Sequence, residues 1–168
     1  MKYYFCPNCG SRYPDPAFSA NRKCGSCGQI LYLNSKPTAS TIIVRDGRLL
    51  LGRRRIEPAK GKWDIIGGFL DYGEHPDEGV IREAKEETGL DVRIVGRLGF
   101  FLDEYGADRE ATLNVCYATE VVGGEMKADD DIEELKWFDP GEIPEDIACE
   151  SCNRRIEAWR QFSSGHGV

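Results

Sequence analysis

Hydrophobic and polar positions follow two different periods along this chain, and together they predict a sheet-rich domain with two helices. Short apolar runs of strand character occupy residues 41–44, 49–51, 63–66, 92–101, 111–122 and 135–138. Asp46-Gly47 between the first two runs is a hairpin turn signal. We expect the polar stretch 103–110 to separate two strands and residues 34–37 to form a linker.

Helical spacing is found in residues 77–88 and 150–162, and we expect residues 163–168 to be a frayed tail. Pro76 suits the first position of the earlier helix, and Gly89 suits its C-terminal cap.

Three acidic residues of the earlier helix, Glu83, Glu86 and Glu87, lie at i, i+3 and i+4 and therefore share one face. Like charges at this spacing repel by a few tenths of a kcal/mol per pair. A bound divalent cation would turn this unfavourable electrostatic energy into a favourable one. Hard cations prefer carboxylate and carbonyl oxygens, and Gly67-Gly68 would let a backbone carbonyl approach. A solvated acidic face is the alternative interpretation.

A longer pattern surrounds these glutamates. Gly68 is followed after five residues by Glu74, and after seven more by Arg82-Glu83-Ala84-Lys85-Glu86-Glu87-Thr88-Gly89-Leu90. This resembles the full Nudix box of the Nudix hydrolases, and segments 49–54 and 60–64 resemble the family's approach to the box. Ile66 departs from the pattern, because many members have proline there.

The resemblance implies an α+β fold, a Nudix α/β/α sandwich with a mixed sheet. It also implies hydrolysis of a pyrophosphate bond in a nucleoside diphosphate linked to another moiety, with Mg²⁺ or Mn²⁺. The implied metal ligands are Gly68, Glu83, Glu86 and Glu87. Glu83 is expected to be a ligand or the general base, although the loop 129–134 could also supply the base. Arg82 would orient a glutamate, and Glu74 would support the site from outside the metal shell.

Two C-x-x-C pairs near the N-terminus, Cys6/Cys9 and Cys24/Cys27, are separated by fourteen residues. Four thiolates in this arrangement suit Zn²⁺, with iron or a disulfide pair as alternatives. About 30 residues bury too little core to fold unaided, so a structural zinc ribbon is predicted over 1–36 and the hydrolase domain over 37–168. We expect the ribbon to stabilise the fold or to form a dimer, so a homodimer is one of the two alternatives.

A third C-x-x-C, Cys149 and Cys152, shares a helical stripe with Ile156 and Trp159. We expect two small buried hydrophobes there; a redox pair or a second metal site is the alternative. The seven cysteines without a signal peptide favour thiols or metal ligation over disulfides. His75 lies at a position that the box leaves free, and no chemistry is expected of it.

Net charge is −7 and the sequence pI is about 5.0. This balance argues against non-specific nucleic-acid binding, which requires basic surface. The local basic cluster, Arg53-Arg54-Arg55 with Lys60 and Lys62, is either a solvated edge or a phosphate-facing rim. No apolar run approaches the ~20 residues of a membrane helix. A cytoplasmic protein with a small-molecule nucleotide substrate is expected.

The substrate is the least determined part of the prediction. A ribbon beside a Nudix box resembles the NADH pyrophosphatases, but their Ser-Gln-Pro-Trp-containing signature is missing from 91–105. The chain is more similar to enzymes acting on ADP-ribose and nucleotide sugars. NADH or NAD-capped RNA, and a non-catalytic nucleotide sensor, are the alternatives. The aromatic candidates for a base platform are Phe100, Phe101, Tyr105 and Trp137.

Overall fold

A seven-stranded mixed sheet forms the centre of the protein in the computed structural model, which describes residues 3–17 and 21–166. Five strands follow the order β11 (Ile132–Phe138), β6 (Arg48–Arg54), β5 (Lys36–Arg45), β10 (Glu110–Gly124) and β9 (Leu90–Tyr105). The short strands β7 (Trp63–Asp64) and β8 (Ile66–Phe69) pair with β6 and β5. Within this sheet β5 and β10 run parallel, and the other pairs are antiparallel.

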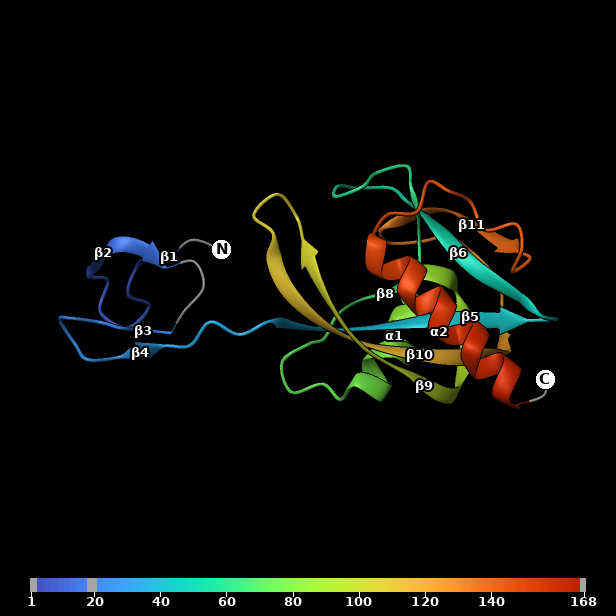
Figure 1. The fold of residues 1–168 in the computed structure, drawn as a ribbon, viewed down its shortest axis with the longest axis horizontal. Helices are drawn as coiled ribbons and strands as arrows, with labels where there is room; N and C mark the ends of the chain where they lie inside the picture. The colour runs from blue at the N-terminus through green and yellow to red at the C-terminus, as the bar shows by residue number, and fades with distance from the viewer. Residues whose placement is uncertain (1–2, 18–20, 167–168) are drawn as a thin grey trace.

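Two helices cover opposite faces of the sheet (Figure 1). Successive side chains of a strand point to opposite faces, so Ile42 packs in the core under α2 (Glu150–His166) while Ile43 packs in the core under α1 (Pro76–Thr88). The same alternation separates Leu49 and Leu51 from Leu50 on β6. The expected sandwich with a mixed sheet is confirmed.

The β9–β10 hairpin is longer than the sequence pattern predicted. Residues 103–110 were expected to lie between strands, but β9 runs to Tyr105 and β10 begins at Glu110. Cross-strand pairing of Asp103 with Thr112 and of Tyr105 with Glu110 continues the ladder through this polar sequence. The turn is confined to residues 106–109, where Gly106 and Arg109 adopt positive φ of 72° and 50°.

Two other boundaries differ from expectation. The linker predicted over 34–37 ends earlier, because Lys36 already pairs with Thr112 in the parallel ladder. The tail predicted over 163–168 is helical as far as His166, and Ser164 Oγ donates to the Arg160 carbonyl 2.8 Å away within that last turn. Residues 167–168 of the predicted tail lie outside the described part of the chain.

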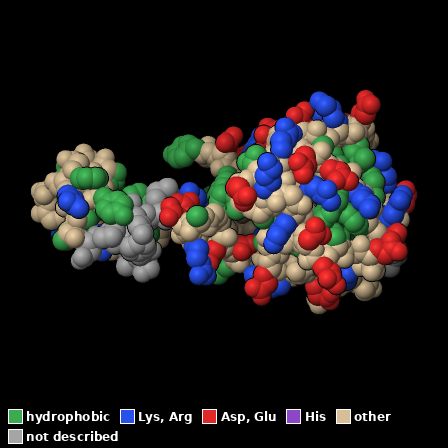
Figure 2. Space-filling model, turned by 90° about the horizontal axis from the view of Figure 1, so that it is seen from above, with side chains coloured by type: hydrophobic (Ala, Val, Ile, Leu, Met, Phe, Trp, Pro, Cys, Tyr) green, Lys and Arg blue, Asp and Glu red, His purple; other side chains and the backbone are tan. Residues whose placement is uncertain are grey.

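The N-terminal unit consists of two small hairpins that stand apart from the sheet (Figures 1 and 2). The first pairs β1 (Tyr3–Phe5) with β2 (Arg12–Ala17), and the second pairs β3 (Arg22–Lys23) with β4 (Ile30–Leu31). Cys6, Tyr13 and Cys24 form a small buried cluster of their own, against which Tyr3 and Leu31 pack. A cluster of this size is consistent with a unit that depends on a metal.

Neither helix in the described ranges combines the length and the apolar character that crossing a bilayer would require.

Candidate active site and metal centres

Helix α1 carries the acidic cluster, and local sequence fixes both of its ends. The helix begins at Pro76, and His75 Nδ1 accepts a hydrogen bond from the Asp77 N–H 3.2 Å away, which caps the first turn. Gly89 at φ 70° ends it, with its N–H bonded to the Lys85 carbonyl. The sequence predicted these ends, but it had given His75 no role.

Glu87 is the most enclosed of the three glutamates and is tied to the sheet. Its side chain is buried, and its Oε2 accepts a hydrogen bond from the Gly67 N–H at 2.9 Å. Burial raises the pKa of Glu87 to about 8, and the nearby carboxylates of Glu83, Asp64 and Asp131 act in the same direction. Below this pH the carboxyl of Glu87 holds a proton unless a cation compensates its charge.

Glu83 lies against the other glycine of the pair. A Cβ built on Gly68 would lie 2.6 Å from Glu83 Oε1 and 2.8 Å from Oε2, so only glycine leaves room for this carboxylate. Glu83 is also buried, and burial raises its pKa. Glu86, one turn along from Glu83, is about half exposed, with 49% of its side-chain surface accessible.

Arg82 braces the cluster. Its Nε and Nη2 donate to the two Glu74 oxygens at 2.7 and 2.8 Å, and its Nη1 donates to Glu83 at 2.8 Å and Glu86 at 2.9 Å. Nη2 also reaches the Phe69 carbonyl at 3.2 Å. The guanidinium lowers the pKa of Glu74 to about 2, as expected for a bidentate pair. The expectation that Glu74 acts from outside the cluster agrees with this geometry.

The acidic loop 129–134 lies beside the C-terminal end of α1. The Asp129 N–H donates to the Glu87 carbonyl at 3.2 Å, and the Arg55 N–H donates to the Asp131 carbonyl at 2.7 Å. Asp130 is near enough to Glu83 to raise the pKa of that carboxyl. The two predicted sources of a general base are therefore neighbours in space.

The acidic residues of α1 are of the donor type that a hard divalent cation prefers, but oxygens of Glu83, Glu86 and Glu87 do not all come within 4.8 Å of one another in the described structure. Glu83 and Glu87 contribute buried carboxylates, and Glu86 adds an exposed one on the same helix face. Oxygen donors of this kind are those that Mg²⁺ and Mn²⁺ prefer. A cation would offset the burial that raises the pKa values of Glu83 and Glu87.

A cleft of about 280 Å³ adjoins the paired glycines, and Gly67 and Gly68 form part of its wall. Its other lining residues come from strands β5 to β10, from residues 58–59, 65 and 106, and from α2 with the segment that leads into it. Inside it, Asn114 accepts from Ser40 Oγ at 2.7 Å and donates to Thr38 Oγ1 at 2.9 Å. These polar side chains therefore satisfy one another within the cleft wall.

Charged and aromatic side chains complete this cleft. Arg54 Nη1 lies 3.0 Å from Asp64 Oδ2, and both residues line the wall. Phe69 and Tyr105 meet edge to face there, with ring centroids 5.1 Å apart. Arg155 is buried deeper, and its Nε has no hydrogen-bond partner within the described residues.

The predicted basic cluster divides between the two roles considered for it. Arg54 lines the cleft, whereas Arg53 pairs with Glu134 at 3.3 Å and lies 4.9 Å from the centre of the Trp63 ring. Arg55, Lys60 and Lys62 are exposed. Of this cluster, Arg54 alone lines the cleft.

The aromatic candidates separate in the same way. Tyr105 lines the cleft, whereas Phe101 packs against the core under α2 and Trp137 against the core under α1. Phe100 is exposed and stacks with Arg97, 5.3 Å from its ring centre. Sequence reasoning missed Phe69, Asp64 and Asn114 as cleft residues. For Asn114 a signal existed, because an amide at an inward position of an apolar strand is unusual.

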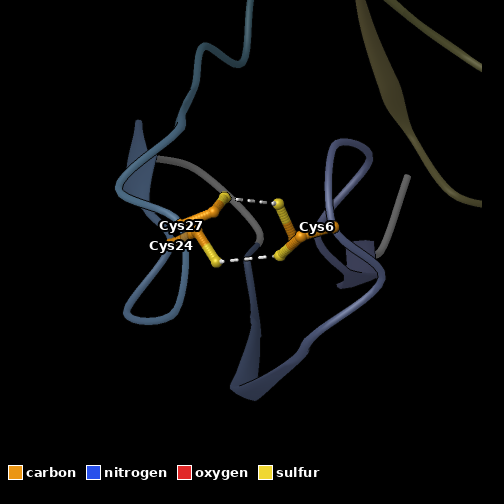
Figure 3. A group of neighbouring side chains, drawn as sticks. Cys6, Cys24 and Cys27 are labelled. Atoms are coloured by element: carbon orange, nitrogen blue, oxygen red, sulfur yellow. Dashed lines mark hydrogen bonds between the residues drawn. The ribbon is translucent and has the colours of Figure 1, made fainter.

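The four N-terminal cysteines converge as predicted. Figure 3 shows Cys6 facing Cys24 and Cys27 across this cluster. Cys6 Sγ lies 3.7 Å from Cys27 Sγ, and Cys9 Sγ lies 3.7 Å from Cys24 Sγ. Sulfur atoms about 2.3 Å from a tetrahedral zinc are about 3.8 Å apart, so the cluster has the size of a zinc site. Backbone N–H groups of Cys9 and Asn8 lower the pKa of Cys6 to about 6, which favours the thiolate.

The third cysteine pair was interpreted wrongly as two buried thiols. Cys149 and Cys152 form a disulfide, so the expectation that the cysteines are thiols or metal ligands fails here. Cys149 directly precedes α2 and Cys152 lies in its first turn, and a helical turn brings residues three apart together. The redox alternative that the spacing left open agrees with this bond.

Comparison with known proteins agrees with this architecture. The NUDIX domain family model matches residues 35–159. The chain is 37% identical over 114 residues to an ADP-ribose pyrophosphatase of Methanocaldococcus jannaschii, an alignment that covers 68% of each protein. It is 33% identical over 141 residues to an NAD-capped RNA hydrolase NudC of Chromobacterium violaceum, covering 83% of this chain and 51% of that one. The chain thus spans about half the length of that relative.

Solved structures give the same picture. A NUDIX hydrolase from Nitrosomonas europaea superimposes with a TM-score of 0.80 at 22% identity, covering 98% of this chain and 94% of that one. A MutT NUDIX hydrolase from Burkholderia pseudomallei gives a TM-score of 0.69 at 27% identity, covering 74% and 98%.

Proposed function

The chain belongs to the Nudix domain family, and on that premise we propose that it hydrolyses the pyrophosphate bond of ADP-ribose or a related nucleotide sugar with Mg²⁺. The products would be a nucleoside monophosphate and a phosphorylated remainder. The observation that carries the proposal is the position of Gly67 and Gly68. Their backbone borders the ligand cleft and also contacts the carboxylates of Glu87 and Glu83.

In this proposal Glu83, Glu86 and Glu87 hold the divalent ion, and the Gly68 carbonyl is available beside them. When Mg²⁺ is bound, its charge attracts phosphate oxygens and lowers the pKa of a coordinated water. Glu87 is the fixed member, because its bond to the Gly67 N–H and its burial limit its motion. Glu86 is half exposed, so a cation held by this carboxylate would be accessible to an incoming phosphate.

Arg82 orients the acidic set, since it contacts three of the glutamates at 2.7 to 2.9 Å. The proton of the attacking water passes to a carboxylate, either Glu83 or Asp130 in the adjoining loop. Burial and neighbouring charge raise the pKa of Glu83, which suits this carboxylate to accept a proton. The leaving group keeps the electron pair of the broken P–O bond.

The cleft supports a substrate with a ring system on one side of the pyrophosphate. Phe69 and Tyr105 offer aromatic faces for a base or sugar, and Arg54 offers a cation. Asp64 and Asn114 provide carboxylate and amide groups that suit ribose or sugar hydroxyls. A relative named ADP-ribose pyrophosphatase is 37% identical to this chain over 114 residues.

We also propose that residues 1–36 are a zinc ribbon with a structural role and that 37–168 form the hydrolase domain. The sulfur spacing of 3.7 Å supports zinc at Cys6, Cys9, Cys24 and Cys27. Soft thiolates select zinc and hard carboxylates select magnesium, so the two metal sites would not exchange.

A substrate panel tests this function directly. Purified protein would be incubated with Mg²⁺ and ADP-ribose, a uridine diphosphate sugar, NADH or a deoxynucleoside triphosphate, and the products separated by chromatography. Glu86→Gln should abolish the signal, whereas Glu78→Gln, the same change on an exposed position of the same helix, should retain it. No hydrolysis of any compound by the wild type would contradict the proposal and favour a nucleotide sensor.

NADH or NAD-capped RNA is the second candidate. Similarity to the NudC proteins covers 83% of this chain, more than the 68% covered by the ADP-ribose pyrophosphatase. Against it, residues 91–105 form a strand without the NADH signature. A higher kcat/KM for NADH than for ADP-ribose in the same panel would decide for this candidate.

A further inference from the structure

The disulfide between Cys149 and Cys152 lies beside the cleft, at the N-terminus of α2. Cys149 Sγ accepts a hydrogen bond from the Cys152 N–H at 3.2 Å, and Ser151 Oγ lies 3.3 Å from the same sulfur. Donors at the start of a helix stabilise a thiolate at this position, which is the setting of C-x-x-C pairs that exchange electrons. The proposed hydrolysis uses neither sulfur.

The two sulfurs differ in access. Cys152 has no exposed surface and packs in the core under α2, whereas Cys149 is half-buried and lines the cleft. A reductant can therefore reach Cys149 through the cleft, with Cys152 as the leaving sulfur. This division between an attackable and a protected sulfur is typical of a pair that opens and closes in the folded protein.

A third group connects the pair to the ligand space. Cys152 Sγ lies 3.2 Å from Asp64 Oδ1, and Asp64 Oδ2 pairs with Arg54 at 3.0 Å in the cleft wall. Asp64 Oδ1 also accepts the Ile65 N–H at 2.8 Å. Two residues further along, Gly67 donates to Glu87. Through Asp64, a change at Cys152 therefore affects both the wall of the cleft and the strand that leads to the acidic cluster.

We propose that Cys149 and Cys152 form a thiol–disulfide exchange site, reduced by a dithiol, whose redox state changes substrate binding in the adjoining cleft. The proposal goes beyond hydrolysis, and its chemical part holds whatever the substrate is.

The exchange conserves electrons and atoms. A thiolate of the dithiol attacks Cys149 Sγ, the Cys149–Cys152 bond breaks, and Cys152 leaves as a thiolate that takes up a proton. The second thiol of the reductant then attacks the mixed disulfide and releases Cys149. Two electrons and two protons pass to the protein, and the reductant becomes a disulfide.

Reduction should narrow the cleft. Two non-bonded sulfur atoms need more room than a bonded pair, and the close-packed surroundings of Cys152 leave it none. Cys149 must then move toward the open side, which is the cleft. The new Cys152 S–H can also donate to Asp64 and alter its pairing with Arg54. We therefore expect weaker substrate binding in the reduced state.

Thiol trapping tests the exchange itself. The full zinc-loaded protein would be equilibrated with mixtures of reduced and oxidised dithiothreitol and alkylated with N-ethylmaleimide. Peptide mass spectrometry then reads residues 149–152 separately from the ribbon. We expect this peptide to pass from unlabelled to doubly labelled without unfolding. A doubly labelled peptide in excess oxidised dithiothreitol, or labelling only after denaturation, would overturn the proposal.

Kinetics test the coupling to the cleft. The KM of the wild type should rise at least about fivefold on reduction, the low end of typical coupling between sites. Cys152→Ser should lose this response, and Cys116→Ser, a buried cysteine outside the pair, should keep it. Equal KM values in both redox states would overturn the coupling. Uptake of a second zinc by the reduced wild type, but not by Cys152→Ser, would instead assign Asp64 and the pair to a metal site.

Because alkylation requires no turnover, failure of the substrate panel leaves the trapping result intact. Hydrolysis without a redox response would equally leave the proposed function standing.

Discussion

Glu87 Oε2 accepts a hydrogen bond from the backbone N–H of Gly67, 2.9 Å away, and this bond joins the acidic helix to the strand that borders the cleft. Gly67 adopts φ 147°, and a Cβ there would lie 2.3 Å from the Ala39 carbonyl oxygen. The backbone can therefore meet Glu87 in this way only at a glycine. This contact therefore joins the acidic helix to the wall of the cleft.

Removing either charge of the Glu86–Glu87 pair should stop turnover while the fold survives. Replacing a residue that supports a metal ligand typically lowers activity by about 10- to 100-fold, and replacing a direct ligand should lower it by at least the larger factor. We therefore expect kcat to fall by about 100-fold or more in Glu86→Gln and in Glu87→Gln. Steady-state rates at saturating Mg²⁺ measure this, and circular dichroism checks the fold. Near-normal rates in both variants would remove them from the active site.

Arg82→Lys should lower the rate without removing the acidic set. Lysine keeps the charge but cannot bond Glu74 through two parallel N–H groups while also reaching Glu83 and Glu86. We expect a 10- to 100-fold fall in kcat and a higher Mg²⁺ concentration for half-maximal activity. Titration of activity with Mg²⁺ separates the two effects. An unchanged Mg²⁺ requirement would show that Arg82 does not position the ligands.

Gly68→Ala should displace Glu83. The added methyl would lie 2.6 to 2.8 Å from the Glu83 carboxylate, closer than such atoms approach. We expect a large loss of activity with little loss of stability, because the carboxylate can rotate away. Gly141→Ala is the matched control, since a Cβ there meets nothing within 4 Å. Equal activities in the two variants would mean that catalysis does not depend on the position of the Glu83 carboxylate.

Cys24→Ser should release the zinc. The remaining three sulfurs cannot close a tetrahedral structural site, so metal analysis should fall from about one zinc per chain toward zero. The ribbon should unfold, whereas the hydrolase domain should persist because its cores are made of other residues. The Cys116→Ser variant should retain the ribbon zinc. Full zinc and full stability in Cys24→Ser would refute a four-cysteine site.

Some elements of the fold were predicted from the sequence more accurately than others. The box helix was predicted to within one residue because Pro76, Gly89 and the apolar positions all agree. The long β9–β10 hairpin was not, since its polar end is held by cross-strand pairing that local composition does not reveal. The acidic set follows from spacing within one helix.

The cleft could not be predicted, because Asp64, Tyr105 and Asn114 come from separate strands that only the sheet brings together. The Cys149–Cys152 bond was missed for another reason. General cysteine usage was given more weight than the ability of a single helical turn to join the two sulfurs.

Without Mg²⁺, the protein should lose stability as pH rises from about 4.5 to about 8. Folding raises the pKa of Glu87 from 4.5 to about 8, so in this window the folded state holds a proton that the unfolded state has released. Stability then falls with pH, by at most ~1.4 kcal/mol per pH unit for one group. The raised pKa of Glu83 acts in the same direction.

Urea unfolding at several pH values, in Mg²⁺-free buffer with the ribbon zinc retained, measures this slope for the hydrolase domain. Added Mg²⁺ should flatten it, because the cation binds the charged carboxylates of the folded state and compensates for their burial. Glu87→Gln should also flatten it by removing the titrating group, whereas Glu78→Gln, on the exposed side of the first turn, should leave the slope as it is. If the free energy of unfolding of the wild type instead rises with pH in this window, the charge of Glu87 is already compensated by a cationic side chain in the metal-free protein.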